Sequence, residues 1–175
     1  MEVSANMPES TACEVESLYV EGLRMADLRF GASFLIWGFR HCAAGAAACP
    51  VARRSYEMAF EGDEQALVQL EMLTTAIGET GRRRIWFAPP SCERLTQDEA
   101  CLLEVLEAAQ AQQFARLDDR LCELLAGAPS NLVRRCAHAL ALLFRARGFH
   151  IIAPVDADDR YQDHTVANPL SKMMH

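Results

Sequence analysis

The residues with the clearest chemical capability in this sequence are a histidine and several cysteines. His41 and Cys42 are adjacent, and Cys49 follows them within the same apolar stretch. Imidazole and thiolate groups are ligands of zinc and of haem iron. If the stretch is helical, however, Cys42 and Cys49 share a face but stand about 10 Å apart along the axis, too far for one metal ion. Packing is therefore our first interpretation of these cysteines, and a metal or cofactor site is the alternative.

Two thiols have a cation close by in the sequence. Cys136 follows Arg135, and Cys42 lies two positions after Arg40. A neighbouring cation lowers the pKa of a thiol and so makes it more reactive. The alternative to packing is therefore a helical sensor that uses His41 and the cysteines to bind a metal or cofactor or to respond to redox state. The seven cysteines are odd in number and contain no CxxC pair. We therefore expect reduced thiols, a cytoplasmic location and no bound cofactor.

A second group of residues combines positive charge with aromatic rings. It comprises Arg82, Arg83, Arg84, Trp86 and Phe87. Such a combination can hold phosphates and stack on bases, but the formal net charge of −7 disfavours nucleic acid. Arginine and tryptophan are also enriched at the energetic centres of protein interfaces. We therefore predict that this stretch binds another protein.

The sequence contains no motif for catalysis. Nucleophilic catalysis needs a serine or cysteine with a histidine base, and His41, His138 and His150 lie in no recognisable elbow or phosphate loop. The acidic run at 156–163 lacks the glycine and the final glutamate of a calcium-binding EF-hand loop. We therefore expect a non-enzymatic regulatory or adaptor protein, with the sensor as the alternative.

The composition indicates which elements must position these groups. Ala and Leu together number 48, whereas Val, Ile and Thr together number 20, and the former lose little side-chain freedom in a helix. We predict an all-α, single-domain bundle of five or six helices over residues 14–153. A flexible N-terminus (1–13) and a flexible acidic tail (154–175) flank it.

Apolar periodicity places the helices. A residue every three or four positions from Val15 to Trp37 predicts one long helix, whose segment from Phe30 to Phe39 is the centre of the bundle. Shorter helices are expected at 51–60, after Asp63 and after Pro129. The stretch 82–95 is expected to be irregular, and 149–153 to be an extended segment across the bundle.

The segment 97–126 is predicted to form two helices. It opens with a capping box, in which Thr96 and Glu99 satisfy each other's backbone N–H groups. A weakly apolar run from Ala109 to Gln113 indicates the break, although one continuous helix also fits the spacing.

Two further expectations concern association. The apolar window 31–49 contains Arg40 near its middle, so it is predicted to be a buried core helix and not a membrane span. Leu102 and Val105 lie outside the apolar stripes and indicate a second buried face, hence a homodimer.

Overall fold

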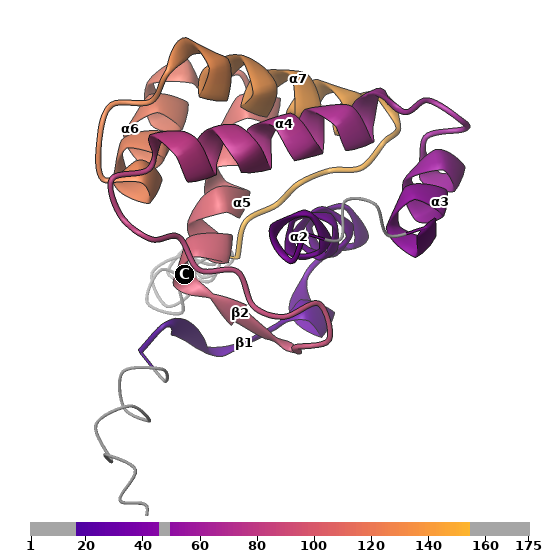
Figure 1. The fold of residues 1–175 in the computed structure, drawn as a ribbon, viewed down its shortest axis with the longest axis horizontal. Helices are drawn as coiled ribbons and strands as arrows, with labels where there is room; N and C mark the ends of the chain where they lie inside the picture. Colours follow the sequence, from indigo (N-terminus) through magenta and orange to yellow (C-terminus); the bar gives the residue numbers. More distant parts are fainter. Residues whose placement is uncertain (1–16, 46–49, 155–175) are drawn as a thin grey trace, which may run out of the picture.

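The structure is a computed structural model that describes residues 17–45 and 50–154. Over these residues the protein is a single, mostly helical domain with six α-helices and a small antiparallel sheet, so the predicted fold class is confirmed (Figure 1). The predicted flexible ends lie outside the described residues, apart from position 154. The elements are β1 (Tyr19–Arg24), the 3-10 helix η1 (Met25–Asp27), α2 (Phe30–Ala43), α3 (Pro50–Ala59), α4 (Gln65–Thr80), β2 (Arg94–Thr96), α5 (Gln97–Gln110), α6 (Phe114–Leu125) and α7 (Asn131–Ala146).

The prediction of one long helix is wrong for the residues before Phe30 that the structure describes. Residues 19–24 form β1, which pairs with β2, and the chain becomes α-helical only at Phe30. Gly22 has a positive φ of +69°, and the Asp27 carboxylate accepts a hydrogen bond from the Arg24 N–H at 2.9 Å. The backbone therefore turns before α2 begins. Three apolar residues of this segment pack against the core even so: Leu23, Met25 and Leu28.

The central helix is α5, not the Phe30–Phe39 segment that we predicted. In Figure 1 α5 passes through the middle of the domain, and it contacts α2, α6, α7 and both strands. Its residues Leu102 and Val105 are fully buried within the monomer. They are therefore no longer evidence for a homodimer, because their partners belong to the same chain.

The aromatic side chains of α2 form a cluster with α3 and α7. The Phe34 ring stacks on Tyr56 at a centroid distance of 4.6 Å, and Phe60 contacts Phe144 at 5.2 Å. Gly38 allows this packing, because a Cβ atom there would overlap the Tyr56 hydroxyl. The predicted helix at 51–60 is thereby confirmed as α3, anchored by its aromatic residues.

A buried ion pair joins α2 to the start of α5. The Arg40 guanidinium donates to both carboxylate oxygens of Glu99, at 2.7 and 2.8 Å, with both side chains at most 1% exposed. Arg40 also donates to the carbonyls of Cys92 and Arg94, at 2.5 and 2.7 Å. The predicted capping box is present, since Thr96 accepts from the Glu99 N–H and Glu99 accepts from the Thr96 N–H. Arg40 is thus a structural cation that organises the chain before α5.

The two-helix prediction for residues 97–126 is also confirmed. Helix α5 ends at Gln110, and Gln112, with a φ of +58°, turns the chain into α6. The Gln110 side chain then holds the segment after α7: its amide donates to the Phe149 carbonyl at 2.9 Å and accepts from the Ile151 N–H at 3.0 Å. That segment is extended and Ile151 is buried, as predicted.

Among the described residues, no helix combines the length and apolar character needed to cross a membrane. The described part of the window 31–49 lies mostly in α2, where the buried Arg40 donates hydrogen bonds to Glu99 and to backbone carbonyls.

Candidate interaction surface

The stretch 82–87 forms a loop that is tied to the first turn of α5. The Asp98 carboxylate accepts two hydrogen bonds from the Arg83 guanidinium, at 2.5 and 3.0 Å, and one from the Trp86 backbone N–H at 2.7 Å. The Thr96 hydroxyl donates to the Trp86 carbonyl at 2.8 Å. Hydrogen bonding to Asp98 raises the pKa of Arg83, so its guanidinium stays charged. The backbone is therefore held on both sides of Trp86.

The exposed part of this loop is a stacked pair of side chains with a second cation nearby in the sequence. The Arg84 guanidinium lies 4.3 Å from the centre of the Trp86 ring, a cation–π contact, and the Trp86 residue is 40% exposed. Arg82 is also exposed, while its backbone N–H donates to the Leu125 carbonyl at 2.9 Å. We call Arg82, Arg84 and Trp86 the Arg–Trp surface.

The other two residues of the predicted site are held by side chains of other elements. Arg83 is occupied by Asp98, and Phe87 is half-buried, with its ring stacked on Phe39 at a centroid distance of 5.9 Å. The sequence thus identified the loop but did not separate the exposed residues from their supports. Asp98 was missed altogether, although an acidic residue in the first turn of a helix beside an arginine-rich loop is a detectable pattern.

The geometry suits recognition of a partner that carries negative charge. Arg82 and Arg84 present guanidinium groups that can pair with carboxylates, and the exposed indole adds apolar contact area. Because Asp98 and Thr96 already order the backbone, little conformational entropy remains to be lost when the loop binds.

The candidate metal and redox residues lie in a different region. His41 packs against the Trp37 ring, at a centroid distance of 4.4 Å, at the end of α2. Burial raises the pKa of the Cys42 thiol to about 11, with a further contribution from Glu71. At neutral pH Cys42 is therefore protonated, which is unfavourable for both metal binding and nucleophilic attack.

The remaining candidate thiols are Cys136 and Cys49. Cys136 is buried on α7, where burial raises the pKa of its thiol despite Arg135. Cys49 lies outside the described residues. Within 17–45 and 50–154, no group of three or more histidine, cysteine, aspartate or glutamate side chains is arranged to hold a metal ion.

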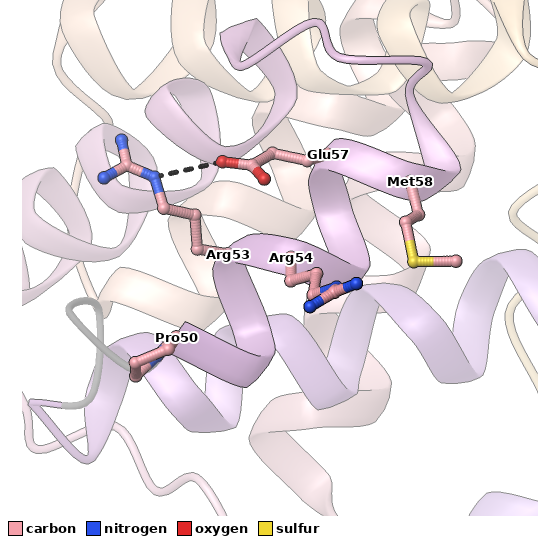
Figure 2. Close-up of a pocket in the computed structure, with 5 residues that line it drawn as sticks. All are labelled: Pro50, Arg53, Arg54, Glu57 and Met58. Carbon is pink, nitrogen blue, oxygen red and sulfur yellow. Dashed lines mark ion pairs between the residues drawn. The ribbon is translucent and has the colours of Figure 1, made fainter.

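Two hollows on the surface were not predicted from the sequence. One, of about 520 Å³, runs along α3, where Arg53 pairs with Glu57 at 3.4 Å (Figure 2). It is lined by Pro50, Arg53, Arg54, Glu57 and Met58. The other, of about 240 Å³, lies between α6 and α7 and is lined by Phe114, Leu117, Asp118, Arg134, Arg135 and His138. In both, an arginine is already neutralised by a neighbouring carboxylate: Arg53 by Glu57, and Arg134 by Asp118 at 2.6 Å.

No protein-family model, curated protein or solved structure matches this chain.

Proposed function

We propose that this protein is a non-enzymatic regulatory or adaptor protein that binds another protein through the Arg–Trp surface. The observation that carries the proposal is the Arg84–Trp86 stack, exposed on a loop whose backbone Asp98 and Thr96 hold in place. Tryptophan and arginine contribute most to binding where they are pre-positioned and can be desolvated together. The partner surface that fits is one that presents carboxylates around an apolar pocket.

Affinity capture from cells, followed by quantitative mass spectrometry, tests this function. We expect one set of proteins to bind the wild-type chain and to be lost from both Trp86→Ala and Arg84→Glu. Arg54→Glu on α3 is the matched control, because Arg54 is also an exposed arginine. Arg83→Glu is unsuitable, since it would repel Asp98 and disturb the loop.

Recombinant candidate partners should then be tested by calorimetry. Loss of the Trp86 side chain is expected to weaken binding at least about tenfold, whereas Arg54→Glu should leave the affinity unchanged. If every captured protein binds Trp86→Ala and Arg84→Glu as well as wild type, the loop is not the interface and the proposal fails.

A further inference from the structure

The solvent-facing sides of α4 and α7 carry apolar residues at helical spacing. Val68 and Met72 on α4 are 39% and 41% exposed, and Leu132 and Leu142 on α7 are 46% and 38% exposed. Thr75 follows Met72 at the same spacing on α4, and Arg135 and Ala139 lie between the two leucines on α7. We call this surface the α4–α7 face; it consists of Val68, Met72, Thr75, Leu132, Ala139 and Leu142.

The two helices lie side by side and run in opposite directions (Figure 1). The Arg82 N–H, just after α4, bonds to the Leu125 carbonyl at the end of α6. At the opposite end, Arg147 after α7 donates to the Phe60 carbonyl, which precedes α4. The last turns of α4 therefore lie beside the first turns of α7, and the two stripes run along one another.

The charges on the two helices have opposite signs. Helix α4 contains Glu71 and Glu79 and no basic residue, whereas α7 contains three arginines and no acidic residue. Glu79 continues the α4 stripe four positions after Thr75, and Arg135 lies within the α7 stripe. Neither Glu79 nor Arg135 has an ion-pair partner among the residues that the structure describes. One surface thus carries both halves of a complementary pair.

We propose that a second copy of this chain covers the α4–α7 face. A two-fold axis parallel to the two helices, outside the face and equidistant from both, lays α4 of each copy on α7 of the other. The four helices then form an antiparallel bundle in which Val68 and Met72 pack against Leu142 and Ala139. The same operation places Glu79 of each copy at the end of the bundle where Arg135 of the other copy lies.

Charge complementarity selects a second copy as the occupant. A surface with one sign of charge would call for a different partner, but here the acidic helix and the basic helix exchange places under the two-fold rotation. The loop that carries the Arg–Trp surface runs from the end of α4 towards β2 (Figure 1). The proposed dimer contact uses no residue of this loop.

Analytical ultracentrifugation of the full chain, from about 1 to 200 µM, tests the dimer directly. We expect the mean mass to rise from that of one chain to that of two across this range. A single-chain mass at every concentration would overturn the proposal. It would leave the proposed function intact, because the Arg–Trp surface lies on another element.

Apolar-to-charged substitutions locate the interface. Met72→Glu and Leu142→Glu are each expected to weaken dimerisation at least about tenfold, because each buries a carboxylate in the contact. Met58→Glu on α3 is the matched control, since Met58 is 73% exposed and lies outside the face. Thermal unfolding should confirm that all three variants fold. A dimer that survives both substitutions uses a different surface and contradicts the inference.

A charge exchange tests the two-fold arrangement itself. Glu79→Arg and Arg135→Glu should each weaken the dimer several-fold, because each places like charges opposite one another. The double variant restores opposite charges at both ends of the bundle and should recover wild-type association. A double variant as weak as the singles would show that Glu79 and Arg135 do not meet, and the proposed packing would be wrong.

Discussion

Asp98 and Glu99 are adjacent carboxylates in the first turn of α5, yet they hold two different regions of the molecule. Glu99 is fully buried and accepts hydrogen bonds from Arg40, from Ala88 and from Thr96. Asp98 is also largely buried, at 8% exposed, but it holds Arg83, whose side chain is 37% exposed, and the Trp86 N–H. One residue step along a helix turns the side chain by roughly 100°, so the two carboxylates meet different arginines, one buried and one partly exposed.

The comparison shows how burial determines what a carboxylate contributes. Removing a partner from a fully buried pair leaves a charge without water. The Arg83–Asp98 pair keeps contact with water through the partly exposed Arg83, so its loss costs less. We therefore expect Glu99 and Arg40 to control folding. Asp98 should mainly control the order of the loop that carries the Arg–Trp surface.

The largest predicted effect comes from Arg40→Met. It leaves Glu99 buried without its cation and removes the donors to the carbonyls of Cys92 and Arg94. We expect a loss of about 3–5 kcal/mol in the free energy of unfolding, measured by urea denaturation. Arg24→Met is the control, because the Arg24–Glu93 pair is exposed and should change stability by less than about 1 kcal/mol. Equal effects of the two substitutions would refute the distinction by burial.

Two helical glycines extend the comparison to packing. In Gly38→Ala the new methyl group meets the Tyr56 ring, whereas at Gly78 on α4 it meets open space. Gly38→Ala should destabilise the protein by about 1–3 kcal/mol, because overpacking displaces the aromatic cluster. Gly78→Ala should stabilise it by up to about 1 kcal/mol through helix propensity. Thermal unfolding measures both, and a stabilising Gly38→Ala would show that Tyr56 has room to move.

Asp98→Asn should have a smaller effect on stability and a local effect on the loop. We expect a loss of about 1–2 kcal/mol, since the asparagine amide is uncharged and keeps only one of the two oxygens that accept from Arg83 and the Trp86 N–H. Hydrogen exchange at the Trp86 amide should accelerate, while exchange in the middle of α5 should change far less. Uniform acceleration over the whole domain would mean that Asp98 acts on the fold as Glu99 does.

The thiols should show the same division between interior and surface. Burial raises the pKa of Cys42 from 9.0 to about 11 and that of Cys101 to about 12, whereas Cys122 is exposed. At pH 8 we expect iodoacetamide to modify Cys122 well before Cys42 and Cys101, as peptide mass spectrometry would measure. Rapid modification of Cys42 in the folded protein would contradict its protonated state and would favour a reactive thiol at this position.

The raised thiol pKa values also predict how stability depends on alkaline pH. Below pH 9 these thiols are protonated in both the folded and the unfolded chain. As the pH rises through 9 towards 11, the unfolded chain releases the Cys42 proton first, so stability is lost over that window. Urea denaturation at successive pH values should show a shallower decline for Cys42→Ala than for wild type.

The helices that the sequence predicted best are those that begin with a recognisable capping residue. The Thr96–Glu99 capping box starts α5, and the Ser130 hydroxyl accepts from the Val133 N–H at the start of α7. These signals are local, because the capping side chain lies within three residues of its target. The prediction of a long helix is wrong over residues 17–29, because apolar spacing alone does not reveal that β2, about 70 residues away, pairs with this segment.

The candidate surface was predicted only in part for the same physical reason. Arginines and aromatic residues at 82–87 are visible in the sequence, but exposure depends on neighbours from other elements. Phe39 covers Phe87, and Asp98 binds the partly exposed Arg83, so we assign the contact to Arg82, Arg84 and Trp86.

By itself, the sequence of this protein determined the helical class, most helix boundaries and the position of the irregular loop, because these depend on side-chain entropy, capping and residues close together in the chain. Only the tertiary structure decided that α5 is central, that Arg40 is a buried support and that α4 and α7 share an apolar face. Those features depend on which distant residues meet, and a buried charge or an exposed methionine is defined only after the chain has packed.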